Sequence, residues 1–379
     1  MRRLAYLVGA LVAVFILLLA AVRLFLGGGR RMEDRTTAPL LPPTALETVV
    51  DLDHPPGNVA VSADSRVFFT LHPDGNPPLK VLELVDGQPK PYPDEAFQHA
   101  GAARYFQSPL ALRVDRQDRL WVLDYANYGR GQPELLAFDL KTNALVHQFD
   151  FPSNVAGFLS MLNDFQIDPQ GRMIYIAETS PFLQRPALIV YDSMRKTSRR
   201  VLDGHPSVAT QDYVIQAPGR DMVVYGLATL RIAVDSIALD TRGEWLYYGA
   251  VTGDRLYRVR TQDLNDESLS ASTLAARVED FAAKTLSDGI TMDIEDNLYL
   301  SDMEHSAIVR LGQDRRLTTL LKDSRLRWPD GFSFAPHAWL YVTCSSLQNV
   351  LFVPSSEVRA HAPYQIFRFQ PGVPGVPGH

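Results

Sequence analysis

The sequence predicts an all-β protein, a six-bladed β-propeller preceded by an N-terminal transmembrane or signal-anchor helix. One pattern occurs six times along the chain: a polar residue, a short apolar strand, a turn and a second apolar strand. The copies follow one another at near-regular intervals, which is typical of a repeat architecture. A run of 19 residues without a charge stands in front of them, and a run of this kind is typical of a membrane span.

The apolar run extends from Leu4 to Val22 and follows Arg2 and Arg3. At about 1.5 Å per residue it is long enough to cross the hydrocarbon of a bilayer. A cleaved signal peptide usually has a shorter apolar region and a small-residue cleavage site, so we expect residues 1–26 to be an uncleaved anchor. Arginines flank both ends of the run, so the charge rule alone does not decide its orientation.

The segments on either side of the repeats have the composition of irregular chain. Residues 27–44 are rich in Gly, Arg, Thr and Pro without apolar periodicity, which predicts a flexible stalk. The propeller is expected over residues 45–370, and residues 371–379 are expected to be a disordered tail.

Composition narrows the class of function. Apolar residues make up 46% and charged residues 21% of the chain, as in an ordinary globular protein. The net charge of -6 and the lack of a basic patch argue against a nucleic-acid partner. A single cysteine, Cys344, excludes an intrachain disulfide.

Each repeat is expected to form one blade of four short strands. The residues that end the first strand of each copy are separated by 53, 53, 72, 53 and 42 positions. They are Val61, Val114, Ile167, Leu239, Met292 and Phe334. Further strand-like stretches follow in each period, such as Ala307–Leu311 and Leu317–Leu321, with Gly, Asp and Asn turns between them. Four-stranded units of this length pack radially as propeller blades.

The two irregular periods predict how the ring closes and where it carries an insertion. The sixth period is short of strands, whereas Leu46–Leu52 precedes the first period and has no blade of its own. We expect this segment to be the outer strand of the last blade. The long third period predicts an insertion around Val201–Thr229 over one face of the disc.

The residues that open the first strands are expected to ring one mouth of the central channel. Many are polar: Asn58, Ser108, Asn163, Asp164, Asp235, Ser236, Asp288 and Asp330. Loops between second and third strands reach the same face and add Tyr125 and Glu178. Converging Asp and Asn oxygens suit a divalent cation such as calcium, and equally the ammonium group of an amine. Crowded carboxylates also raise one another's pKa, which favours general acid or base chemistry. Taken singly, each position also has a structural interpretation as a turn former.

Six segments resemble, in the same order, motifs of the major royal jelly protein and yellow family. They are Leu136–Thr142, Leu162–Asp168, Tyr175–Glu178, Leu188–Asp192, Ser287–Ile290 and Trp328–Gly331. The resemblance implies an extracytoplasmic propeller whose channel mouth binds small molecules, including biogenic amines in some relatives, with dopachrome-converting activity attributed to others. Together with the apolar N-terminus, it implies a bacterial extracytoplasmic protein, periplasmic or secreted, and we expect the N-terminus to hold it at the inner membrane.

A more distant resemblance runs to the gluconolactonase and regucalcin propellers. The resemblance implies a divalent metal held by Glu, Asn and Asp at strand starts. Here Asn163 matches the Asn position, and Asp235 or Asp288 matches the Asp position, which makes these three residues the candidate metal ligands. The first repeat begins with Asn58 where that pattern has Glu. This departure argues against metal-dependent lactonase chemistry, so calcium or another divalent cation stays an alternative.

Three functional hypotheses follow. The first is binding of an amine or related polar aromatic molecule, by Asn163, Asp164, Asp235, Asp288, Asp330, Tyr125, Phe165 and Glu178. The second is an enzyme, either a tautomerase in which a carboxylate moves a proton or a metal-dependent lactonase. The third is a scaffold for another envelope protein. We assign no catalytic residue, and we expect the propeller to be a monomer.

Overall fold

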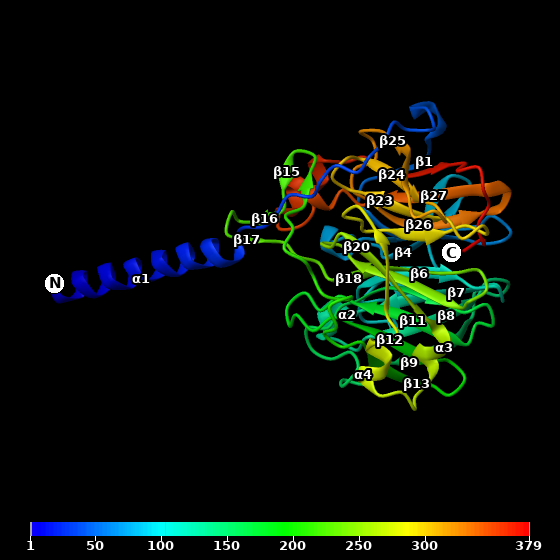
Figure 1. Ribbon diagram of the computed structural model, residues 1–379, viewed down its shortest axis with the longest axis horizontal. Coiled ribbons are helices and arrows are strands. Elements are labelled where there is room, and N and C mark those ends of the chain that lie inside the picture. The colour runs from blue at the N-terminus through cyan, green and yellow to red at the C-terminus, as the bar shows by residue number, and fades with distance from the viewer. Residues whose placement is uncertain (1, 103, 379) are drawn as a thin grey trace.

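The computed structural model describes residues 2–102 and 104–378. Within them, six four-stranded antiparallel sheets are arranged as the blades of a ring, and one long helix extends away from it (Figure 1). The helix, α1 (Arg2–Leu26), contains a span from Tyr6 to Leu26 that is long and apolar enough to cross a membrane. The six-bladed propeller and the N-terminal apolar helix predicted from the sequence are therefore confirmed.

Five blades follow the chain directly, and each begins with its inner strand. Blade 1 contains β2 (Pro56–Val61), β3 (Val67–Leu71), β4 (Val81–Val85) and β5 (Gln88–Pro91). Blade 2 contains β6 (Pro109–Val114), β7 (Arg119–Asp124), β8 (Glu134–Asp139) and β9 (Leu145–Asp150). Blade 3 contains β10 (Leu162–Ile167), β11 (Met173–Glu178), β12 (Ala187–Asp192) and β13 (Thr197–Val201).

The remaining blades complete the ring. Blade 4 contains β18 (Val234–Leu239), β19 (Trp245–Ala250), β20 (Arg255–Arg260) and β21 (Glu279–Ala283). Blade 5 contains β22 (Ile290–Met292), β23 (Leu298–Asp302), β24 (Ala307–Leu311) and β25 (Leu317–Lys322). Blade 6 contains β26 (Pro329–Ala335), β27 (Trp339–Cys344), β28 (Tyr364–Phe369) and, from the other end of the chain, β1 (Glu47–Leu52).

The strand β1 closes the ring, as predicted. It pairs antiparallel with β28, with Glu47 opposite Arg368 and Leu52 opposite Tyr364. The apolar core lies between neighbouring blades, as where Trp121 of blade 2 packs in one cluster with Ile174 of blade 3. Inner strands such as β2 and β6 are buried along their whole length because the adjacent blades cover both faces.

The insertion between blades 3 and 4 is also confirmed. It carries two short hairpins, β14 (Gln216–Ala217) with β15 (Arg220–Asp221) and β16 (Val223–Val224) with β17 (Ala228–Thr229). The second hairpin contacts the end of α1, where the Thr229 hydroxyl donates a hydrogen bond to the Gly28 carbonyl at 3.0 Å.

The predicted flexible stalk, residues 27–44, is instead held along the propeller. The Arg30 amide donates to the Asp212 carbonyl at 2.8 Å, at the insertion. Further on, the amides of Leu40 and Leu41 donate to carbonyls of β25 at 3.0 and 2.9 Å. The stalk thus covers the otherwise open edge of blade 5, and pairing of exposed edge groups stabilises such an arrangement.

The predicted disordered tail is likewise ordered over residues 371–378. It crosses the mouth of the channel opposite to the ends where the inner strands begin. The Ile294 amide donates to the Pro374 carbonyl at 3.0 Å, and the Gly378 amide donates to the Phe334 carbonyl at 3.0 Å. Val376 borders a small cavity with Ile167, Leu239 and Met292, at the far ends of three inner strands. Backbone hydrogen bonds, which its Pro- and Gly-rich sequence does not reveal, hold this segment in place.

Candidate functional site

A cavity of about 450 Å³ opens at the mouth where the inner strands begin. Its polar floor comes from the starts of five inner strands, in blades 1, 3, 4, 5 and 6. The floor residues are Asn58, Asn163, Asp235, Asp288 and Asp330. The insertion, the mouth loops and Leu26 at the end of α1 form its walls.

A repeated β-bulge places these polar side chains at the mouth. The pairing of inner and second strands is irregular between Pro56 and Val59, and again at the matching point of blades 3, 4 and 6. Asn58, Asn163, Asp235 and Asp330 fall inside these irregular stretches. A bulge leaves a residue unpaired and re-aims its side chain, so the same local device turns a polar group toward the channel in four blades.

Arg113 lies at the centre of a buried network beside the floor. It belongs to β6 and is 2% exposed. One guanidinium nitrogen donates to both carboxylate oxygens of Asp164 at 2.8 Å, and another donates to Oδ1 of Asn58 at 2.7 Å. Asp164 is therefore neutralised by Arg113 and does not line the cavity. We did not predict Arg113, although a single arginine in an otherwise apolar strand, Pro109–Val114, is a usable signal.

The three carboxylates of the floor itself have no such partner. Among the described residues, no Arg, Lys or His nitrogen lies within 4.0 Å of Asp235, Asp288 or Asp330. Each has one neutral donor: Asn163 Nδ2 lies 2.6 Å from Asp235, Trp328 Nε1 lies 2.5 Å from Asp288, and the Ser345 side chain bonds Asp330. This part of the floor is thus rich in uncompensated acidic groups.

Burial and mutual repulsion act on these carboxylates in the same direction. Burial is the main cause that raises the pKa of Asp235 and of Asp330 well above the usual range, and the neighbouring carboxylates add to it. Burial likewise raises the pKa of Asp288 to about 6, against the opposing hydrogen bond from Trp328. At neutral pH the floor holds charge only at a considerable cost, which a bound cation would offset.

Lys284 is a second buried charge that we did not predict. It is 1% exposed, and its Nζ donates to the Thr285 carbonyl at 3.0 Å and to the Ser287 hydroxyl at 3.3 Å. Burial lowers its pKa to about 7, while Asp254 and Asp288 act in the opposite direction. Lys284 and Asp288 therefore both titrate near neutrality, a property that clusters at functional sites.

The walls of the cavity are mainly apolar and aromatic. They include Tyr128, Phe182, Ile232, Leu347 and Phe352. The rings of Tyr128 and Phe182 meet edge to face at 5.1 Å. The Thr179 hydroxyl also borders the cavity and has no hydrogen-bond partner in the described part of the chain, although it is buried. An apolar wall with a few convergent polar groups is the usual composition of a ligand site.

The structure separates the predicted site residues into two groups. Asn163, Asp235, Asp288 and Asp330 line the cavity, as we expected. Asp164, Tyr125, Phe165 and Glu178 do not line it.

Each of the residues outside the cavity has another role. Tyr125 and Phe165 pack in the core between blades 2 and 3. Glu178 is buried and paired with Arg200 at 2.8 Å, while it accepts a hydrogen bond from Ser160 at 3.0 Å. Tyr125 and Phe165 thus face the neighbouring blade, whereas Glu178 is held by partners of its own blade.

The predicted metal ligands Asn163, Asp235 and Asp288 are not arranged as a cation site. Asn163 and Asp235 bond to each other through the amide nitrogen, and an amide N–H is not a metal ligand. Within the described residues, no group of three or more Asp, Glu, His or Cys side chains could hold a metal ion. The geometry of these side chains therefore gives no support to a divalent cation, and metal binding stays a prediction.

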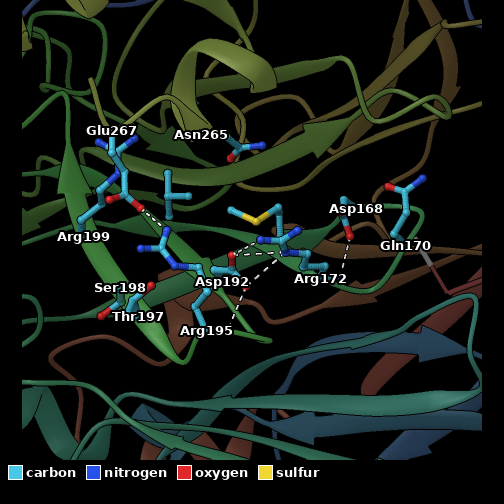
Figure 2. Close-up of a pocket in the computed structure, with 12 residues that line it drawn as sticks. Asp168, Gln170, Arg172, Asp192, Arg195, Thr197, Ser198, Arg199, Asn265 and Glu267 are labelled. Carbon is cyan, nitrogen blue, oxygen red and sulfur yellow. Dashed lines mark hydrogen bonds and ion pairs between the residues drawn. The ribbon is translucent and has the colours of Figure 1, made fainter. Parts of the chain in front are cut away.

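A second cavity, of about 490 Å³, lies at the outer edge between blades 3 and 4 (Figure 2). It is slightly larger than the mouth cavity, but its charges are already paired. Arg172 binds Asp192 at 2.6 Å, and Arg195 binds Glu267 at 2.5 Å. Arg199 donates to the Leu264 carbonyl. Because these groups satisfy one another at the surface, we place the candidate site at the channel mouth.

A closed ring of six four-stranded blades with a cavity at one channel mouth defines the class of six-bladed propellers. The fold is similar to that of a gluconolactonase from Xanthomonas campestris, with a TM-score of 0.56 and 14% identity over 87% of this chain and 89% of that one. It is also similar to the calcium-binding protein regucalcin from Agrobacterium tumefaciens, with a TM-score of 0.53 and 14% identity over 87% and 94%. At this level of identity the likeness concerns the fold alone.

Sequence comparison identifies the family. The profile of the Major royal jelly protein family matches residues 107–348, which is more than half of the chain, so this protein belongs to that family. Major royal jelly protein 3 of Apis mellifera is 27% identical over 273 residues, which cover 66% of this chain and 48% of the relative. Major royal jelly protein 1 is 31% identical over 222 residues, covering 52% and 48%. The chain spans about half the length of the curated relatives it matches.

Proposed function

We propose that this protein binds a small cationic molecule, an amine with an apolar or aromatic body, in the mouth cavity. The proposal depends above all on the carboxylates of Asp235, Asp288 and Asp330, which lack a cationic partner within 4.0 Å among the residues that the structure describes. Asp235 and Asp288 are buried, and Asp330 is partly buried. An ammonium group would supply the missing charge by charge-assisted hydrogen bonds. The rings of Tyr128, Phe182 and Phe352 would contact the remainder of the ligand.

The proposal is tested by calorimetric titration of the full-length protein in detergent with a panel of aromatic amines. Neutral isosteres of the same amines, with a hydroxyl group in place of the ammonium, serve as ligand controls. We expect saturable binding of amines only, and we expect Asp235→Asn to weaken it roughly tenfold or more, because a hydrogen bond to a charged group contributes about 1.5–3 kcal/mol.

Asp314→Asn is the matched control variant, since Asp314 is exposed in the turn between β24 and β25, away from the cavity. It should bind amines as the natural chain does. Equal affinity for amines and their neutral isosteres, or unchanged affinity in Asp235→Asn, would refute the proposal.

A second candidate function is isomerisation by proton transfer, of the tautomerase type. It is favoured by the pKa of Asp288, about 6, beside that of Lys284, about 7. In such a reaction the Asp288 carboxylate would take a proton from one atom of the ligand and return it to another, with no net oxidation. Turnover of a dopachrome-type substrate that is lost in Asp288→Asn, with the fold intact, would support it. Turnover that persists in this variant would exclude Asp288 as the base.

We also propose that α1 holds the propeller at the outer surface of the inner membrane, as the family resemblance implies. A reporter enzyme that is active only outside the cytoplasm, fused after His379, tests the orientation. We expect activity from this fusion. Activity only from a reporter that works in the cytoplasm would reverse the assignment.

A further inference from the structure

Large apolar side chains are exposed on the face of the propeller that carries the mouth cavity. They belong to four separate loops and are Phe158, Phe182, Leu183, Tyr225 and Phe352, each 48% exposed or more. The loops connect β9 with β10, β11 with β12, β16 with β17 and β27 with β28. Three of these loops follow the second or the fourth strand of a blade. Because neighbouring strands of a blade run antiparallel, the second and fourth strands end on the face where the inner strand begins. The fourth lies in the insertion, which borders the cavity. We call this surface the rim face.

The exposed groups of the rim face continue into the cavity. Phe182 and Phe352 are both exposed and line it. Tyr225 of the insertion meets Phe352 with a ring-centroid separation of 6.3 Å, and Phe182 meets Tyr128 at 5.1 Å. Single exposed apolar residues are ordinary, but a cluster of them around an opening marks an interaction surface.

The helix α1 leaves the molecule from the same face. Leu26, its last residue, is part of the cavity wall. Directly after it, Gly28 accepts hydrogen bonds from Thr229 and Arg231 at 3.0 Å, so the insertion holds the end of the helix. Figure 1 shows α1 extending from the side that carries β16 and β17, with the C-terminus on the opposite side.

This connection leaves no spacer between the apolar span and the cavity. The span runs from Tyr6 to Leu26, so a bilayer crossed by α1 ends within about one helical turn of the mouth. Arg23 lies in the last turn of the helix, where a long basic side chain extends toward the headgroups. Aromatic side chains prefer this same interfacial layer.

We propose that the rim face rests in the headgroup region of the bilayer that α1 crosses, so that the cavity opens onto the membrane interface. The partner is thus the lipid surface itself. A ligand then reaches the floor carboxylates from the interface, which favours amphiphilic amines over freely water-soluble ones. The membrane proposal depends on α1 crossing a bilayer and not on the identity of the ligand. The rim face can therefore lack contact with lipid while the cavity binds amines, and it can contact lipid while the cavity binds none.

The test measures the depth of fluorescent labels on the full chain in phosphatidylcholine vesicles that contain nitroxide-bearing lipids. Tyr225→Cys and Phe182→Cys place a label on the rim face. Val12→Cys places one inside α1, and Met194→Cys places one on the turn between β12 and β13, at the opposite end of the blades. The natural Cys344 is buried, so the introduced cysteine is the one that reacts.

We expect the lipid nitroxides to quench most of the fluorescence at positions 12, 182 and 225 and little of it at position 194. If the label at position 12 is quenched but the labels at positions 182 and 225 are quenched no more than the label at position 194, the proposal is overturned. The rim face would then be a surface for a protein partner. Absence of quenching at 12 would overturn it as well, because α1 would not be inserted. Each labelled variant must keep the thermal midpoint of the natural chain, and Phe158→Cys or Phe352→Cys replaces a rim-face variant that does not.

Discussion

The charge of Asp288 is set by neighbours that act in opposite directions. Burial and the nearby Asp164 favour the protonated acid, whereas Trp328 and Lys284 favour the carboxylate, and the resulting pKa is about 6. In the unfolded chain this group has its ordinary pKa of 3.8. The folded state therefore keeps a proton between these two pH values that the unfolded chain has lost, and the stability contributed by this proton is lost as pH rises through about 6.

Replacing Asp288 by Asn removes this titration. At pH 7 the variant should be more stable than the natural chain by at most about 3 kcal/mol, since one unit of pKa shift corresponds to 1.36 kcal/mol. Its thermal midpoint should also fall less between pH 4 and pH 7. Thermal unfolding across this range, with Asp314→Asn as the control, measures the difference. Parallel curves for the natural chain and Asp288→Asn would show that Asp288 has no raised pKa.

For Arg113 and Asp164 we expect the opposite effect: removing one charge should destabilise the protein, because here both charges are buried and paired. Arg113→Met leaves the Asp164 carboxylate without its cation, which should cost about 3–5 kcal/mol. The double variant Arg113→Met with Asp164→Leu should recover a large part of this loss, since neither charge remains. Urea unfolding of the two single variants and the double variant measures the coupling. Additive effects would contradict a direct buried ion pair.

At the scale of the elements, the C-terminal segment 371–378 closes the mouth opposite to the cavity through close backbone contacts. A Cβ atom added at Gly375 would lie 2.1 Å from the ring of Phe334 on β26. Gly375→Val should therefore displace the segment, lower stability by about 1–3 kcal/mol as an overpacked site does, and open the tail to proteases. Val373→Ala, at a half-exposed position of the same segment, is the control.

Limited proteolysis followed by mass spectrometry measures this displacement. We expect cleavage after Phe369 to be fast in Gly375→Val and slow in the control. Equal rates would mean that the tail leaves the mouth readily in the natural chain, as the sequence alone had led us to expect.

The same elements show how far the sequence predicts the structure. The repeat of polar starts and apolar strands predicted the blades, the closing strand and the five polar residues of the cavity floor, because these depend on side-chain pattern. The ordered segments 30–41 and 371–378 were missed, since backbone hydrogen bonds hold them and these do not depend on side-chain type. Arg113 was missed because its partners Asn58 and Asp164 come from other blades, and Lys284 was missed because its burial arises only in the folded chain.

For the whole molecule, the N-terminal segment joins the apolar helix α1 to the closure of the ring. From the end of α1 the chain bonds to the insertion, then to the edge of blade 5, and then enters blade 6 as β1. The apolar helix, its cavity-lining residue Leu26 and the closing strand are therefore parts of one continuous segment. Because the inner strands of blades 1 and 6 pack against each other, an opening of the ring at this point exposes both of these blade faces.

Two shortened chains test the importance of this closure. A chain that starts at Thr36 keeps the pairing with blade 5 and β1, whereas a chain that starts at Asp53 lacks β1 and leaves the edge of β28 unpaired. The second chain also loses the buried Val50 and Leu52, each contributing about 1.5–3 kcal/mol. We expect the first chain to unfold in one cooperative transition as a monomer, and the second to unfold at a lower temperature and to associate through its open edge, which light scattering detects. If the chain that starts at Asp53 stays monomeric and has the same thermal midpoint as the chain that starts at Thr36, packing between the blades is enough to hold the ring without the closing strand.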